Sequence, residues 1–231
     1  MKFINIKNQS ETGKILADKI GEYLKQDKKV LWLLSGGSNI SIAVEALNIL
    51  KKDFSSVIAS GAKQSSLKDN LAVTLTDERF GPVGHKDSNW QQLLLGGFDM
   101  SSVYAVPILC GMEPKETVIE FGKKYRDLTA EADVIIGQFG LGADGHTAGV
   151  LPNTIGVKDQ GTSCFYDGGK FKRVTLTLKT IRNINIAYTF AFGESKKEIV
   201  KSIQSKNIPL EAMPAQVLNE IEESYLYSDQ I

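Results

Sequence analysis

Cysteine and histidine are both scarce in this chain of 231 residues. The two cysteines, Cys110 and Cys164, are too few and too far apart for a disulfide framework or a zinc-ligand pattern, so we expect two reduced thiols and no metal site. Of the two histidines, His85 lies in a turn-rich loop and receives no role. The other, His146, lies in a glycine-rich segment and becomes the first candidate for acid–base chemistry.

An excess of charge and long apolar runs are also missing. With 27 basic and 27 acidic side chains the formal net charge is zero, which argues against a nucleic acid or an anionic membrane as the main partner. No window approaches the roughly 20 apolar residues of a membrane span. The first residues, MKFINIKNQSETGK, contain no apolar core followed by a cleavage site. We therefore expect a cytoplasmic protein with a small-molecule partner.

The apolar patterns indicate one α/β domain spanning residues 1–231. Short continuous apolar runs at 30–34, 71–76 and 132–139 are typical of parallel strands covered by helices on both faces. Helical spacing appears at 10–26, with Ser10 as a possible N-cap, and at 115–131. We further expect strands at 3–6, 103–106, 173–178 and 185–192, a helix containing Ile199, Val200 and Ile203, a short covering helix at 213–218, and a loop or mobile insertion at 51–70.

The segment Gly140–Pro152, GLGADGHTAGVLP, follows one of the predicted buried strands. Ligands of open α/β sheets bind beyond the carboxyl ends of strands, so Asp144 and His146 stand where chemistry is expected. The glycines let the backbone approach a ligand closely. The alternative is a plain turn, because an Asp-Gly-His sequence in a glycine-rich loop is by itself weak evidence for catalysis.

A second strand-end segment, Ser35-Gly36-Gly37-Ser38, leads from a strand into a helix. This arrangement offers free backbone N–H groups and a helix dipole to an anion such as phosphate. It lacks the lysine of a P-loop and the third glycine of a dinucleotide fingerprint, so nucleotide binding is disfavoured. The alternative is an ordinary strand-to-helix turn.

A third strand ends at Asp77-Glu78-Arg79. Charges are costly to bury unless they are paired, and the planar guanidinium of Arg79 suits phosphate or carboxylate, so Arg79 is a candidate anion clamp. An internal ion pair is the alternative. Ser88 or Asp87 then caps a predicted short helix that runs through Leu93 to Leu95.

Taken together, SGGS, TDERFGPVGHKDSNW and GLGADGHTAGVLP resemble the motif set of the 6-phosphogluconolactonase family. The segments RVTLTL and GESK also resemble that family, so the likeness spans about residues 30–200. The resemblance implies a Rossmann-like sheet that binds a sugar-phosphate lactone and hydrolyses it without a metal or organic cofactor. Its substrate would be 6-phosphoglucono-δ-lactone, an intermediate of the oxidative pentose phosphate pathway.

The resemblance also assigns roles to individual residues. His146 matches the catalytic histidine and would act as general base on water, with Asp144 orienting the ring. The remaining residues belong to the expected substrate-binding set, in which the 36–38 backbone and Arg79 hold the phosphate and Asp77 binds sugar hydroxyls: Gly36, Gly37, Ser38, Asp77, Arg79, Gly145, Lys170 and Arg173.

The sequence departs from the family pattern in places. The loop before RVTLTL is shorter and reads DGGKFKRV, so Lys170 and Lys172 compete for the expected lysine, and we favour Lys170. Phe80-Gly81-Pro82 and Gly149-Val150-Leu151-Pro152 also differ, as changes in the lining of the pocket that leave the chemistry intact.

Two alternative functions stay open. Glucosamine-6-phosphate deaminase/isomerase shares the Asp-Gly-His core but has Asn-Glu-Pro after the histidine, where this chain has Val150-Leu151-Pro152. Leucine cannot transfer a proton, which disfavours that activity. A non-catalytic sugar-phosphate-binding protein would keep affinity without turnover. The oligomeric state is also open, with a monomer as one option.

Overall fold

The main structural element is a parallel sheet of seven strands. The computed structural model describes residues 1–59, 66–205 and 207–231. Each pair of neighbouring strands in this sheet is parallel, which confirms the expected α/β class. Their order is β1 (Lys2–Asn5), β10 (Glu223–Ser228), β9 (Ile186–Phe190), β6 (Val134–Gly140), β2 (Val30–Leu34), β3 (Leu71–Leu75) and β5 (Tyr104–Ala105).

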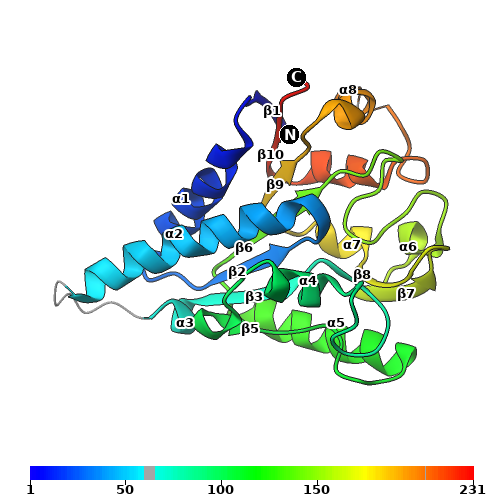
Figure 1. Cartoon of the computed structure of the whole chain (residues 1–231). Coiled ribbons are helices and arrows are strands. Elements are labelled where there is room, and N and C mark those ends of the chain that lie inside the picture. The colour runs from blue at the N-terminus through cyan, green and yellow to red at the C-terminus, as the bar shows by residue number, and fades with distance from the viewer. Residues whose placement is uncertain (60–65, 206) are drawn as a thin grey trace.

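The chain winds outwards from the middle of this sheet in two directions. From β2 it moves to β3 and β5, and from β6 it moves the other way to β9 and β10. Because β-α-β crossovers are right-handed, the two directions place their helices on opposite faces. Figure 1 shows α1 (Thr12–Leu24) and α2 (Ile40–Ala59) side by side across one face. Helices α5 (Pro114–Glu131) and α8 (Lys197–Gln204) lie in connections that run in the other direction along the sheet. They therefore belong to the other face. The crevice at the carboxyl ends of β2 and β6 is where such sheets bind ligands.

A second, antiparallel sheet lies beyond β3. It consists of β4 (Asp77–Arg79), β8 (Lys172–Leu176) and β7 (Ser163–Asp167). The Leu176 amide donates to the Thr76 carbonyl, and the Thr76 amide donates to the Leu34 carbonyl, so this sheet continues from the main one. We propose on this ground that residues 1–231 form one domain. The register sets Arg79 opposite Arg173.

Short helices connect these elements. The α-helical ones are α3 (Leu67–Asn70), α4 (Asn89–Leu95), α6 (Ile155–Lys158) and α7 (Leu178–Ile181). The 3-10 helices are η1 (Gln9–Glu11), η2 (Gly37–Asn39), η3 (Met100–Ser102), η4 (Glu194–Lys196) and η5 (Pro214–Glu220). As expected, Ser88 caps α4, since its side chain accepts from the Gln91 amide at 3.1 Å.

The apolar sequence of β2 follows from its burial. All five of its residues are buried, and the Trp32 ring lies 5.7 Å from that of Phe98. A strand with neighbours on both sides and helices on both faces has no side that meets water, so it contains no polar alternation. Burying each large apolar side chain contributes about 1.5–3 kcal/mol. The loops that follow β2 therefore start from a firmly packed base.

The segment 51–70 differs from the expected loop. Helix α2 continues to Ala59 and α3 covers 67–70, while residues 60–65 lie outside the described part. Phe54 is buried and extends the apolar face of the helix, whereas Lys52, Asp53 and Ser55 are exposed. These polar residues on the outer face conceal the helical period in the sequence.

Both ends of the chain also differ from expectation. The side chain of Asn8, not that of Ser10, caps the first helical turn, by accepting from the Ser10 amide at 3.1 Å. The expected covering helix of the tail is the 3-10 helix η5, and the chain then adds β10, a strand that the sequence does not predict.

No helix of the described residues is both long and apolar enough to cross a membrane. The cytoplasmic location stays a prediction.

The two thiols differ in environment, and this predicts their reactivity. Cys110 is exposed, whereas Cys164 is buried, and desolvation with some help from Asp159 raises its pKa to about 12. We expect iodoacetamide at pH 8 to modify one thiol of the native protein and both after unfolding, because only the thiolate is nucleophilic. Mass spectrometry of the digested protein measures this, and rapid native modification of Cys164 would contradict the burial.

Candidate functional site

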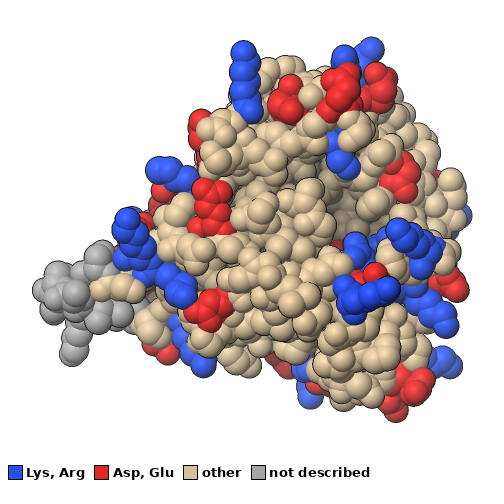
Figure 2. Space-filling model, in the orientation of Figure 1, with Lys and Arg blue, Asp and Glu red and all other residues tan. Residues whose placement is uncertain are grey.

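A cavity of about 270 Å³ opens at the carboxyl ends of the central strands. Figure 2 shows this face hollowed, with Lys and Arg side chains on both sides of the hollow. Segments that follow β2, β3, β6 and β9 meet there, as the sequence predicts for the first three. The residues that line it are Ser35, Gly36, Gly37, Ser38, Asn39, Asp77, Arg79, Asn89, Gly140, Leu141, Gly142, His146, Ala148, Arg173 and Lys196.

The Ser35–Ser38 segment forms the floor of the cavity. The buried Ser35 hydroxyl donates to the Gln138 carbonyl at 2.7 Å and lies 3.2 Å from the Thr76 hydroxyl, so it joins the ends of three strands. Gly36 has no room for a side chain, because a Cβ there would lie 2.0 Å from Oδ1 of Asn89. Gly37 has φ +67°, which favours glycine. The backbone at the start of η2 therefore lines the cavity with no side chain at Gly36 or Gly37.

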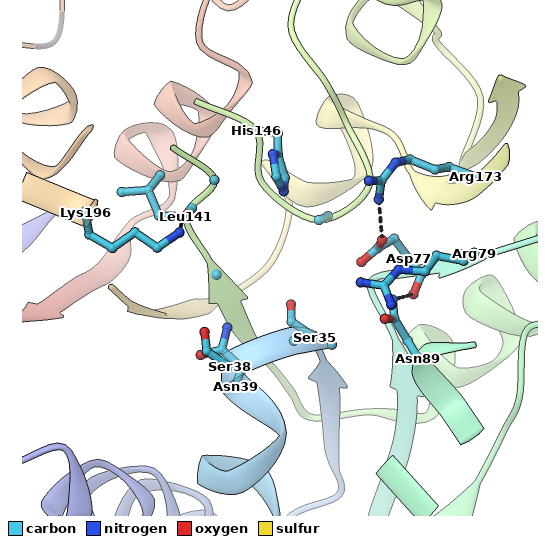
Figure 3. A pocket seen from close by; sticks show the side chains of 15 residues that line it. Ser35, Ser38, Asn39, Asp77, Arg79, Asn89, Leu141, His146, Arg173 and Lys196 are labelled. Atoms are coloured by element: carbon cyan, nitrogen blue, oxygen red, sulfur yellow. Dashed lines mark hydrogen bonds and ion pairs between the residues drawn. The ribbon is translucent and has the colours of Figure 1, made fainter. Parts of the chain in front are cut away.

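Asp77 and Arg173 form the opposite wall. The Asp77 carboxylate is buried and lies 3.5 Å from Nη1 of Arg173. Burial raises the pKa of Asp77, and the charges of Arg173, His146 and Arg79 oppose that shift. The Asn89 side chain donates to the Asp77 carbonyl at 3.1 Å. An acid and two arginines thus share one side of the cavity, as Figure 3 shows.

Glu78 points away from the cavity and has a structural task. Its carboxylate accepts from the amides of Asn89 and Trp90 at 2.6 and 3.0 Å and from the Ser88 hydroxyl at 2.8 Å. Burial raises the pKa of Glu78, and the hydrogen bonds it accepts oppose the shift. A carboxylate at a helix N-terminus is favoured by the exposed amides and the helix dipole. Glu78 therefore ties β4 to the start of α4.

Arg79 lines the cavity and is only partly satisfied by protein partners. Its Nη1 donates to the Asp87 carbonyl at 3.1 Å and to the Gln92 side chain at 3.4 Å, while its buried Nε has no hydrogen-bond partner. His85, which received no role, has Nε2 2.8 Å from the Arg79 carbonyl. It therefore fixes the backbone from which Arg79 extends.

His146 and Asp144 form a pair at the third wall. Nδ1 of His146 lies 2.5 Å from Oδ1 of Asp144, which also accepts from the His146 amide at 3.1 Å. Burial tends to raise the pKa of Asp144, but the interactions with His146 outweigh it and the pKa lies below its usual value. A carboxylate can only accept, so Nδ1 carries a hydrogen and Nε2 of the neutral ring has a free lone pair. Figure 3 shows the ring directed into the cavity.

The loop around this pair is tightly fixed. A Cβ on Gly142 would lie 2.1 Å from Nδ1 of His146, so the ring packs against bare backbone. Gly145 has φ +88° and packs against Met213, but neither Gly145 nor Asp144 lines the cavity. The Tyr166 hydroxyl donates to the Gly149 carbonyl and accepts from the Leu151 amide, which holds the end of the loop.

The lysine in the cavity differs from the one expected. Lys170 and Lys172 are exposed and do not line the cavity. Lys196 lines it instead, and its Nζ donates to the Leu141 carbonyl at 2.6 Å. The GESK segment after β9, which ends at Lys196, carries part of the family resemblance, but the sequence gives it no role in the site. Asn39 and Asn89 were also missed, and each has a buried Oδ1 without a hydrogen-bond partner.

The cavity combines a proton acceptor with cations on two sides. Within the described ranges, no group of three His, Cys, Asp or Glu side chains is arranged to hold a metal ion. Lys196 lies on one side in Figure 3, and Arg79 and Arg173 lie on the other, with His146 and the Ser35–Ser38 floor between them. This arrangement suits an anionic ligand that a cation binds at one end. The rest of such a ligand would lie beside His146, which can act as a general base.

Known proteins resemble the chain over nearly its full length. Residues 8–227 match the family described as glucosamine-6-phosphate isomerases/6-phosphogluconolactonase. A 6-phosphogluconolactonase of Haemophilus influenzae is 27% identical over 230 residues, which cover 93% of this chain and 94% of that protein. These findings confirm the family resemblance that the motifs carry.

Solved structures share the fold. A 6-phosphogluconolactonase from Shewanella baltica has a TM-score of 0.77 at 18% identity, with 99% of this chain and 97% of that one covered. A monomeric glucosamine-6-phosphate deaminase has a TM-score of 0.76 at 16% identity, with 100% and 98% covered. The shared fold therefore does not choose between these two activities. From the match over residues 8–227, this chain belongs to the glucosamine-6-phosphate isomerase/6-phosphogluconolactonase family.

Proposed function

We propose that the chain hydrolyses 6-phosphoglucono-δ-lactone to 6-phosphogluconate, a step of the oxidative pentose phosphate pathway. The Asp144–His146 pair carries this proposal, because it leaves Nε2 with a free lone pair at a cavity with cationic walls. The names of the relatives support it, and so does the 27% identity with the Haemophilus influenzae lactonase.

The proposed reaction needs one base and no cofactor. Nε2 of His146 takes a proton from water as the water oxygen attacks the lactone carbonyl carbon, and the charge moves to the carbonyl oxygen. The tetrahedral intermediate then collapses and its ring C–O bond breaks. The imidazolium returns the proton to the departing ring oxygen, which becomes a hydroxyl. Asp144 stabilises the imidazolium and keeps the ring oriented during both steps.

Two cations compete for the phosphate, and their surroundings differ. The sequence-based proposal pairs Arg79 with the backbone of 36–38. Arg79 shares its wall with the Asp77 carboxylate, which repels a phosphate dianion and suits sugar hydroxyls. On the opposite wall, the hydrogen-bond partner of Lys196 is a carbonyl rather than a carboxylate. This charge distribution favours Lys196 as the phosphate partner, with the sugar end near Asp77 and Arg173.

Paired substitutions separate the two assignments. We expect Lys196→Ala to raise KM for the phosphorylated lactone about 10- to 100-fold, the cost of a charge-assisted hydrogen bond, and to leave KM for unphosphorylated glucono-δ-lactone unchanged. Arg79→Ala is expected to raise KM for both lactones. Initial rates with the two substrates measure this. A phosphate-selective effect of Arg79→Ala alone would restore the sequence-based assignment.

The activity itself is tested with lactone generated in the cuvette from glucose 6-phosphate, with the spontaneous hydrolysis subtracted. Acceleration by the chain supports the proposal. Turnover of glucosamine 6-phosphate instead would identify the deaminase, although Val150 and Leu151 provide no acid where that family has a glutamate. Binding of 6-phosphogluconate without any turnover would identify a non-catalytic sugar-phosphate-binding protein.

A further inference from the structure

Three cations surround the ring of Phe171, which lies in the turn between β7 and β8. The guanidinium carbons of Arg79 and Arg173 lie 4.9 and 6.0 Å from the ring centroid, and Nζ of Lys170 lies 5.2 Å from it. Phe171 itself is half-buried and does not line the cavity. The ring therefore acts on the cavity through the two arginines, which do line it.

The polar contacts of the two arginines leave their orientation incompletely fixed. Arg79 donates to the protein through Nη1, and Nη1 of Arg173 lies 3.5 Å from Asp77. The Nε atoms of both residues are buried without a hydrogen-bond partner. A guanidinium anchored at one nitrogen can still rotate its plane, whereas the face of an aromatic ring attracts the cation and restrains it.

Backbone hydrogen bonds fix the turn that carries Phe171. The Gly168 amide donates to the Phe171 carbonyl at 2.9 Å, and the Phe80 amide donates to the Lys172 carbonyl at 2.8 Å. Gly169 has φ +83°, and a Cβ on Gly168 would lie 3.0 Å from the Phe171 carbonyl oxygen. This tight turn gives the ring a fixed base beside the arginine wall.

We propose that Phe171 is a positioning residue, whose ring holds the guanidinium planes of Arg79 and Arg173 in the orientation that faces substrate. Its kinetic consequence rests on the proposed function, because both arginines face the cavity where the lactone would bind. Phe171 thus determines how well the site recognises the substrate without touching it. Lys170, the lysine favoured from the sequence, contacts the same ring from outside the cavity.

Substitutions of similar volume separate ring electrostatics from packing. We expect Phe171→Leu to raise KM for the phosphorylated lactone about tenfold, with kcat less affected. A tenfold change corresponds to the loss of one or two cation–π contacts. Phe171→Tyr keeps the ring face and should restore the wild-type KM. Lys158→Ala is the control, since Lys158 is exposed, does not line the cavity and has no contact to the ring among those described. Equal KM values for the Leu variant and the wild type would overturn the proposal.

A measurement without turnover keeps the inference separate from the proposed function. In ¹⁵N spectra of arginine side chains, assigned with Arg79→Lys and Arg173→Lys, we expect slow rotation about the Nε–Cζ bonds in the wild type and fast rotation in Phe171→Leu. Slow rotation that persists in the Leu variant would overturn the positioning role, whatever the kinetics show. If the wild type lacks lactonase activity, the proposed function fails and this spectrum alone decides the role of Phe171.

Discussion

We expect His146→Ala to lower kcat for the phosphorylated lactone by about 10²- to 10⁴-fold, the usual contribution of a positioned general base, with little change in KM. The physical reason is that Nε2 of the imidazole is the group placed to accept a proton at the cavity wall, while the cations that would hold the substrate lie elsewhere. Initial rates corrected for spontaneous hydrolysis measure the loss. Calorimetric titration with 6-phosphogluconate measures the affinity that remains.

Asp144→Asn is the companion variant for this experiment. An amide keeps the size of the side chain but is a weaker acceptor for Nδ1–H and does not stabilise an imidazolium. Its kcat is therefore expected between those of the wild type and His146→Ala. Turnover by His146→Ala at the wild-type rate would remove His146 from the mechanism, and a matching loss of product affinity would indicate damage to the site as a whole.

Gly142→Ala is expected to abolish most activity while leaving the histidine in the sequence. The added methyl carbon would lie 2.1 Å from Nδ1 and 2.3 Å from Cε1 of His146, and 2.6 Å from Oδ1 of Asp144. The ring must leave its place beside Asp144, and a displacement of about 1 Å in a catalytic group costs on the order of 10²-fold in rate. The measurement is kcat together with the melting temperature, which should fall only slightly because the side chains that must move, Asp144 and His146, are exposed and half-buried.

The matched control is Gly21→Ala in α1. A Cβ there would lie 3.5 Å from Leu50, an ordinary contact, and alanine is the better helix former, so stability should rise by up to about 1 kcal/mol. Activity should not change. If Gly142→Ala retains full activity, the ring position beside Asp144 is not required for turnover.

The strands that carry the site could be predicted because a strand that is buried on both faces consists mostly of apolar residues. Val30–Leu34, Leu71–Leu75 and Val134–Gly140 lie inside the sheet and are mostly apolar. Strand β10 escaped because its sequence ESYLYS mixes polar and aromatic residues. Strand β4 escaped because it reads Asp-Glu-Arg, and only tertiary partners, Arg173 for Asp77 and the start of α4 for Glu78, make those charges compatible with a sheet.

Those parts of the candidate site that consist of residues close together in the sequence could be predicted. The 35–38 loop and the Asp144–His146 pair depend on neighbours in sequence, so their patterns are readable. Lys196 reaches the cavity from a segment that follows β9, and its place depends on the order of the strands in the sheet. No sequence pattern reports that Phe171 meets Arg79, because the two residues are far apart in the sequence and come together only when β4 pairs with β8.

The pairing of β1 with β10 has a consequence for how the chain is made. These strands form one edge of the sheet, with Lys2 opposite Tyr225. Strand β1 is translated before every other strand of this sheet, yet its sole neighbour in the described sheet, β10, is translated after all of them. Contacts between such distant segments carry a large loop-closure entropy and slow folding. The first strand of the sheet to be translated is therefore among the last to find its partner, and it stays unpaired until β10 follows.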